Sequence, residues 1–155
     1  MRRSEREITD PEKLRQILDA CKVCRIAMQD EQGLYLVPLN FGYTYQAGRL
    51  CLYFHSAPEG RKIAALQKHP EVCFEMDCDH RLIAGAQACS YGYAYQSIIG
   101  TGRARFLTDP TEKAKALAAL MRCQTGKEFS FTEQMTASVA VFMIEAAHFC
   151  GKSHR

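Results

Sequence analysis

The links between the strand-like segments are short, and this restricts the possible folds more than any other feature of the chain. Asp30 to Gly33 makes a turn between residues 22–28 and 34–45, and Ala47 to Arg49 leads into residues 50–55. Links of this length close antiparallel hairpins, whereas a parallel pair needs a crossover of a dozen or more residues. The sequence therefore predicts an antiparallel sheet rather than a doubly wound parallel one.

Six segments carry the apolar and alternating patterns of strands. They are residues 22–28, 34–45, 50–55, 71–77, 91–107 and 138–149. Gly100 and Gly102 fall inside the fifth segment, where glycine indicates bulges or close backbone approach. Residues 79–90 have no such pattern, and we expect a loop there.

Three short helices are expected between these strands. Two begin at Thr9-Asp10-Pro11-Glu12 and at Thr108-Asp109-Pro110, where a capping residue precedes a proline suited to the first turn. Another begins at Ser56-Ala57-Pro58-Glu59, which has the form of a capping box, and continues through Leu66. Pro70 prevents that helix from continuing much past Lys68.

These elements predict a mainly β fold, a six-stranded antiparallel β-barrel, closed or partly split, that forms one domain over residues 1–155. A chain of 155 residues can bury roughly 70% of its unfolded surface, which is enough for one core. The segments 50–54 and 139–144 are apolar on both faces, so helices or a second subunit should cover the outside of the barrel. We therefore expect a homodimer.

Composition and charge exclude several classes of function. The net charge is only +3, with the basic residues scattered among acids, so we expect no nucleic-acid partner. The charged start Met1-Arg2-Arg3-Ser4 and the absence of a long apolar stretch predict no membrane segment and a cytoplasmic protein. The eight cysteines should be free thiols, and Cys21-x-x-Cys24 has no second pair, so no metal site is expected.

Two adjacent cations, Arg61 and Lys62, lie close to the start of the expected short helix. Cations there oppose the helix dipole at about 0.3–1 kcal/mol each when exposed, and a bound dianion would reverse that sign. Free backbone N–H groups, the Ser56 hydroxyl and the two cations would together cradle a phosphate. The alternative is that the cations form an ordinary solvated face.

Four segments together resemble the FMN-binding split barrels related to pyridoxamine-phosphate oxidase, and more closely their nitroimidazole-resistance branch. The resemblance covers roughly residues 10 to 150. It rests on the strand 36–43, the segment 53–62, the strand 95–102 and the helix 109–121. It implies the split barrel and an FMN cofactor, with the partner subunit completing the site.

The resemblance also implies which residues hold the flavin. The phosphate would lie against Arg61 and Lys62, and the isoalloxazine ring along the second strand. The implied cofactor-binding residues are Val37, Pro38, Leu39, Asn40, Phe54, His55, Ser56, Arg61, Lys62 and Ser97. His55 matches a histidine near the flavin in this branch and is the candidate catalytic residue, as a proton donor; the alternative is a hydrogen-bonded core histidine.

The predicted function is that of an FMN-dependent reductase that takes electrons from NAD(P)H or another donor and passes them to a small aromatic or nitro compound. Vitamin B6 oxidation is not expected, because residues 144–152 lack the Arg-Leu-x-Pro substrate segment of the oxidase. Two alternatives stay open: a non-catalytic haem or flavin carrier, and a structural or metal-storing protein on the same barrel. The candidate axial ligands for haem are His55, His69, His80, His148 and His154.

Overall fold

The helices begin where local capping chemistry is strongest. In this computed structural model, which describes residues 4–154, Asp10 accepts a hydrogen bond from the N–H of Glu12 at 2.9 Å, and Asp109 accepts one from Glu112 at 2.9 Å. Both starts were predicted and are confirmed. The helices are α1 (Pro11–Ala20), α2 (Arg61–Lys68), α3 (Pro110–Thr125) and α4 (Glu133–Ala137), with short 3-10 turns at Ser4–Arg6 and Ala88–Ser90.

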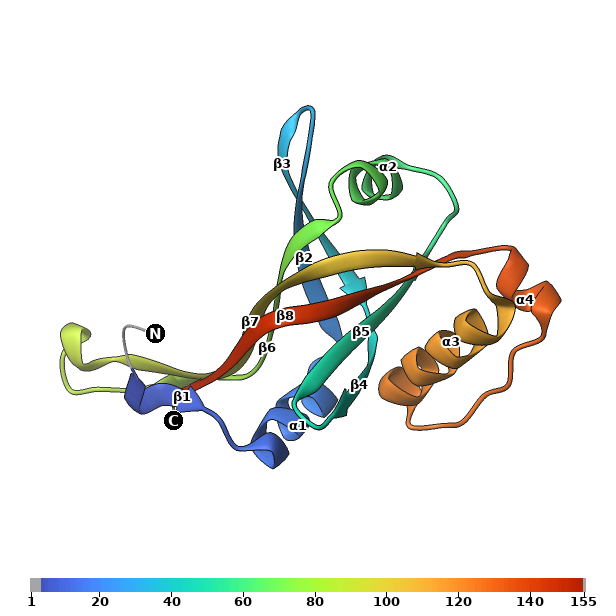
Figure 1. The fold of residues 1–155 in the computed structure, drawn as a ribbon. Helices are drawn as coiled ribbons and strands as arrows, with labels where there is room; N and C mark the ends of the chain where they lie inside the picture. The colour runs from blue at the N-terminus through green and yellow to red at the C-terminus, as the bar shows by residue number, and fades with distance from the viewer. Residues whose placement is uncertain (1–3, 155) are drawn as a thin grey trace.

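The strands form one antiparallel sheet in the order β3-β2-β6-β7-β8-β5-β4, with β1 paired to β8 off this path (Figure 1). Residues 1–3 of the charged N-terminal start, and residue 155, lie outside the described residues. The strands are β1 (Glu7–Ile8), β2 (Val23–Asp30), β3 (Gly33–Asn40), β4 (Gly42–Gln46), β5 (Arg49–Ser56), β6 (Glu71–Ile83), β7 (Gly92–Leu107) and β8 (Ala140–His154).

The prediction of a mainly antiparallel β fold with short helices is confirmed, and the sheet is not closed, but the count of six strands is wrong. One of the two extra strands is the short β1. The other arises because residues 34–45, expected as one strand, are divided at Phe41 into β3 and β4. These two strands pair with different neighbours, β2 and β5, and occupy opposite ends of the sheet order.

The strands β6 and β8 are longer than expected, whereas β7 nearly matches the predicted residues 91–107, and together the three extend as an arm beyond the rest of the sheet (Figure 1). The predicted loop over residues 79–90 begins too early, because Arg81, Leu82 and Ile83 pair with Ala94, Tyr93 and Gly92. The ladder corrects its register across a bulge at Cys78 to Arg81 and so continues to the tip. A second register shift, between Thr101 and Gly102, confirms the bulge expected near the two glycines.

The main core lies between the concave face of the sheet and α1. Its largest members are fully buried phenylalanines, of which Phe54 and Phe142 stack with ring centroids 5.1 Å apart. A smaller cluster on the opposite face of the sheet joins Leu107 and Val141 to Ala116 and Leu117 of α3. Among residues 4–154, no helix is both long and apolar enough to cross a membrane.

Gly42 marks the closest approach between α3 and the sheet, so replacing it should be costly. A side chain there would overlap the backbone of Leu120. We expect Gly42→Ala to destabilise the fold by about 1–3 kcal/mol, the usual cost of overpacking a core. Urea unfolding followed by circular dichroism measures this.

Gly92→Ala is the matched control for that experiment. It is also a strand glycine, but its nearest neighbours would lie 3.6 Å from the new methyl group, an ordinary contact. Equal unfolding midpoints for the two variants would contradict the packing derived for Gly42.

Candidate functional site

Two unpaired strand edges diverge from Phe41, and we call them the split. One edge is β3, which ends the sheet, and the other is Phe54 to Ser56 of β5, because β4 pairs with β5 only as far as Tyr53. Phe41 itself is fully buried and joins β3 to β4 directly. The structure thus places the predicted residues 37–40 on one side of the split and 54–56 on the other.

The side chains of β3 alternate between the core and solvent. Val37 and Leu39 are half-buried against the main core, opposite Ile26 and Cys24. Pro38 and Asn40 are exposed on the other face. A ligand along β3 would therefore meet its backbone edge and the ring of Pro38, rather than the side chains of Val37 and Leu39.

The Asn40 amide is engaged with the body of the protein. Its Nδ2 donates to the Lys22 carbonyl at 3.0 Å and to Oε1 of Gln124 at 3.2 Å. Both amide hydrogens are therefore used, and they tie the end of β3 to the end of α3. Only the side-chain oxygen of Asn40 is left to accept a hydrogen bond from a ligand.

On β5, three predicted residues have different surroundings. Phe54 is fully buried in the stack with Phe142, so it supports the site from inside the core. His55 is exposed, whereas Ser56 is 8% exposed, because successive strand side chains leave on opposite faces. Because their side chains lie on opposite faces of the sheet, His55 and Ser56 can contact the same ligand only if it lies at the edge of β5. This part of β5 is such an edge, since β4 pairs with β5 only as far as Tyr53.

The first turn of α2 spans the split. Lys62 Nζ donates to Ser56 Oγ at 2.5 Å, which ties the turn to β5. Arg61 forms a two-point ion pair with Asp30, with Nε to Oδ2 at 2.5 Å and Nη2 to Oδ1 at 3.1 Å. Its guanidinium also lies 4.1 Å from the centroid of the Tyr35 ring on β3.

The capping box predicted at Ser56 and Glu59 is wrong. The helix begins later, at Arg61, with Gly60 as its N-cap at φ 129° and no side-chain cap. Ser56 is then too far back to cap and binds Lys62 instead. The leading N–H groups of α2 have no capping side chain, which suits them to an anionic ligand.

The electrostatics of this turn favour an anion but include one acid. The Arg61 guanidinium hydrogen-bonds Asp30 and lowers the pKa of that carboxyl below its usual value. Sequence reasoning missed both Asp30 and Tyr35 as partners of Arg61. Asp30 was assigned only to the hairpin turn, and nothing local links it to a residue 31 positions later.

Ser97 is remote from His55 and Ser56 within one chain. It is 8% exposed and pairs with Lys152 of β8, whereas His55 pairs with Val141 of the same strand. Val141 and Lys152 are eleven residues apart, which corresponds to about 36 Å of strand at roughly 3.3 Å per residue. The structure therefore brings nine of the ten predicted residues to the split or beside it, and leaves Ser97 on β7, with β2 and β6 between it and β3.

Comparison with known proteins shows which family this chain belongs to. The sequence pattern of the family described as pyridoxamine 5'-phosphate oxidase matches residues 10–153. The chain belongs to this family. Among proteins with curated functions, none matches the sequence.

The solved structures similar to this chain include one of 33% sequence identity and several of lower identity. A protein from Bacteroides thetaiotaomicron assigned as a 5-nitroimidazole antibiotic resistance protein is 33% identical, with a TM-score of 0.81 over 95% of this chain and 86% of that one. The resemblance to the nitroimidazole-resistance branch is confirmed.

Two structures from Mycobacterium smegmatis share the fold at lower identity. An FAD and haem binding protein is 16% identical, with a TM-score of 0.80 over 97% of this chain and 74% of that chain. An FAD binding protein is 20% identical, with a TM-score of 0.63 over 96% and 98%. Proteins of this fold thus include binders of flavin and of haem.

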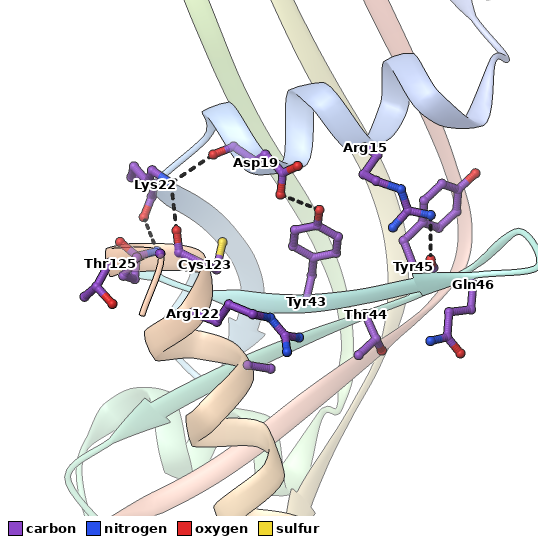
Figure 2. A pocket seen from close by; sticks show the side chains of 13 residues that line it. Arg15, Asp19, Lys22, Tyr43, Thr44, Tyr45, Gln46, Arg122, Cys123 and Thr125 are labelled. Carbon is purple, nitrogen blue, oxygen red and sulfur yellow. Dashed lines mark hydrogen bonds between the residues drawn. The ribbon is translucent and has the colours of Figure 1, made fainter. Parts of the chain in front are cut away.

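A hollow of about 730 Å³ lies away from the split, between α1, β4 and the end of α3 (Figure 2). Its cations are held by the protein itself. Lys22 Nζ donates to the carbonyls of Asp19 at 2.9 Å and Cys123 at 2.7 Å, where α1 and α3 end. Arg15 donates to the Tyr45 carbonyl at 3.2 Å. These contacts connect α1 to β4 and to the end of α3, so the cations of this hollow have a structural role.

The cysteines of the expected Cys-x-x-Cys motif are buried. Cys21 and Cys24 are 2% and 0% exposed, and burial raises the pKa of both thiols, that of Cys24 to about 12. A metal needs the thiolate, which this burial disfavours. Within residues 4–154, no group of three or more His, Cys, Asp or Glu is arranged to hold a metal ion.

Proposed function

We propose that this family member binds a flavin, FMN, in the split and serves as a flavin-dependent reductase. The observation that carries this proposal is the first turn of α2, with Arg61 and Lys62, lying between two unpaired strand edges. FMN has the matching form, with a planar apolar ring that suits a gap between strands and a dianionic phosphate that suits an uncapped helix start.

Lys62 and Ser56 form the part of the site best prepared for the phosphate. They are already in contact at 2.5 Å, and both can donate to a phosphate oxygen. The uncapped N–H groups of α2 add further donors in the same place. Arg61 can join them through the N–H groups that Asp30 does not occupy.

The ring would lie against the edge of β3. The backbone carbonyl and the exposed ring of Pro38 supply a polar edge and an apolar contact, whereas Val37 and Leu39 turn their backbone groups toward β2. A bound flavin supplies hydride transfer, and the protein positions it and tunes its electronics. His55, exposed on β5, can hold a proton at its ring for a substrate in the split, which is the role we propose for it.

The proposed reaction is reduction of a small aromatic or nitro compound with NAD(P)H as electron donor. The relative from Bacteroides thetaiotaomicron assigned to 5-nitroimidazole resistance supports this class of substrate. The family name does not extend to vitamin B6 oxidation, since residues 144–152 lack the Arg-Leu-x-Pro segment. Eight free cysteines support a reducing compartment, the cytoplasm.

We propose a homodimer, because one chain leaves the site incomplete and its arm uncovered. Ser97 lies on β7, far from His55 and Ser56 of its own chain. Toward the tip of the arm, where β6 and β7 meet, Leu82, Tyr91 and Tyr93 are each more than half exposed. A group of large exposed side chains of this kind indicates an interaction surface. A second copy would cover this surface and bring its own Ser97 to the split.

A haem or flavin carrier without catalysis is the second candidate. His80 and His154 line one hollow of about 460 Å³ at the arm, which offers imidazole ligands from two strands. The FAD and haem binding protein from Mycobacterium smegmatis shows that the fold can serve this purpose. Titration with hemin separates a haem carrier, which gives the absorbance band of ligated haem, from the proposed reductase, which does not. A flavin carrier would bind FMN without bleaching when NAD(P)H is added.

The wild-type protein should take up FMN and become yellow, and its flavin absorbance should bleach when NAD(P)H is added without oxygen. The physical reason is that the split supplies both the phosphate donors and the strand edge. Absorbance spectroscopy of the protein after gel filtration measures both steps. Protein that stays colourless after incubation with FMN and with FAD would refute the proposed function.

The double variant Arg61→Ala, Lys62→Ala should lose affinity for FMN on the order of a hundredfold, the effect of losing two charge-assisted hydrogen bonds. Riboflavin has the same ring without the phosphate, so its affinity should stay almost unchanged. Flavin fluorescence titration gives both dissociation constants. Lys68→Ala is the control, because Lys68 is at the other end of α2 and pairs with Glu31.

The protein should sediment as a dimer at micromolar concentration. Its interface should bury at least about 2,000 Å² in total, as obligate dimers do. Leu82→Asp with Tyr93→Asp should shift the protein toward monomer, because charged side chains are disfavoured in an apolar interface. A wild-type monomer that binds FMN tightly would contradict the shared site.

A further inference from the structure

Arg61 is held in place more firmly than its neighbour Lys62. Asp30 receives two hydrogen bonds from Arg61, and the Tyr35 ring lies beneath the guanidinium. Lys62, in contrast, donates to a neutral hydroxyl, and within residues 4–154 it makes no ion pair. The two cations proposed to meet the phosphate are therefore unequal, since one already has an anionic partner.

The geometry of the Arg61 and Asp30 pair makes it a competitor for a phosphate. Carboxylates and phosphates both bind the flat fork of a guanidinium through two parallel N–H bonds. Asp30 occupies Nε and Nη2, which form one such fork. A phosphate that used the same fork would have to displace Asp30, and one that used the remaining N–H groups would lie close to its negative charge.

Asp30 stays in the hairpin turn whether or not Arg61 leaves it. Its Oδ1 accepts the N–H of Gln32 at 2.8 Å, a bond within the turn itself. Arg61 holds the pKa of this carboxyl below its ordinary value, so it is ionised at neutral pH. The negative charge therefore remains next to the first turn of α2 throughout.

We propose that Asp30 is an internal competitor for the ligand's phosphate, which lowers affinity for phosphorylated flavin and narrows the preference for it over unphosphorylated flavin. This inference rests on the proposed function. It assigns to the β2–β3 hairpin a role in setting how tightly the cofactor is held. Arg61 is then a positioning residue for the hairpin in the free protein and a phosphate ligand in the complex.

The test is Asp30→Asn, which removes the charge and keeps an oxygen to accept the Gln32 N–H. The dissociation constant for FMN should fall on the order of two- to fivefold, the range that an exposed ion pair covers. That for riboflavin should not change. Fluorescence titrations with both flavins, at low and at high salt, give the ratio, and the gain should shrink at high salt.

Glu31→Gln is the matched control. It removes the same charge from the next residue of the same hairpin, but Glu31 pairs with Lys68 rather than with Arg61. A gain in FMN affinity equal to that of Asp30→Asn would indicate a general change in charge and overturn the proposal. In the Arg61→Ala background the guanidinium for which Asp30 competes is gone, so Asp30→Asn should no longer raise FMN affinity through it. A gain in affinity as large as in the wild-type background would also overturn the proposal.

The same titrations distinguish this inference from the proposed function. Wild-type protein that binds neither flavin would refute flavin binding, and this inference with it. Wild-type protein that binds FMN, together with an Asp30→Asn variant whose FMN to riboflavin ratio is unchanged or reversed, would refute the role of Asp30 alone.

Discussion

The single residue between β3 and β4 is the constraint on which the rest of the structure depends. Because Phe41 alone joins them, the two end strands of the sheet must come together at that point. The sheet can satisfy this only by curling. Gly42 then lets the backbone of α3 pack directly against β4, and Asn40 and Gln124 bond the end of β3 to the end of α3. Curvature is thus fixed at the closed end, while the edges beyond it stay apart.

The short helix α2 connects the two edges of the split at its open end. It does so with residues that are unfavourable at a helix start. Two cations in the first turn oppose the helix dipole. The helix is retained because Ile63, Ala65 and Leu66 are buried, and because Asp30 and Ser56 receive the cations. The apolar face of α2 therefore stabilises the helix, while its first turn presents groups that can bind an anion.

Most of the fold could be predicted because it depends on neighbours in sequence. The caps at Asp10 and Asp109, the tight turns and the bulge near Gly102 are set by residues within a few positions. The break at Phe41 could not be predicted, since a lone apolar residue in a strand-like run gives no local signal. The pairing of β6 out to Ile83 depends on a bulge that only the partner strand β7 reveals.

The candidate site divides in the same way. The contact of Ser56 with Lys62 joins residues six positions apart around one helix start, so the sequence could indicate that these two residues lie together. The pair of Arg61 with Asp30 joins two elements that meet only in the folded chain. The distance between Ser97 and His55 likewise depends on how far β8 continues, because both strands pair with it, and the pattern of residues 138–149 underestimated its length.

Pro38 has a consequence for the behaviour of the protein in a crowded solution. An unpaired strand edge can recruit a strand of another molecule, and β3 adds to this hazard with Leu34 and Leu36, which are 89% and 57% exposed. Proline has no N–H to donate, so a foreign strand that paired along β3 would lose a hydrogen bond in the middle of the ladder. The edge can therefore stay open to a small planar molecule and still resist growth into an extended intermolecular sheet.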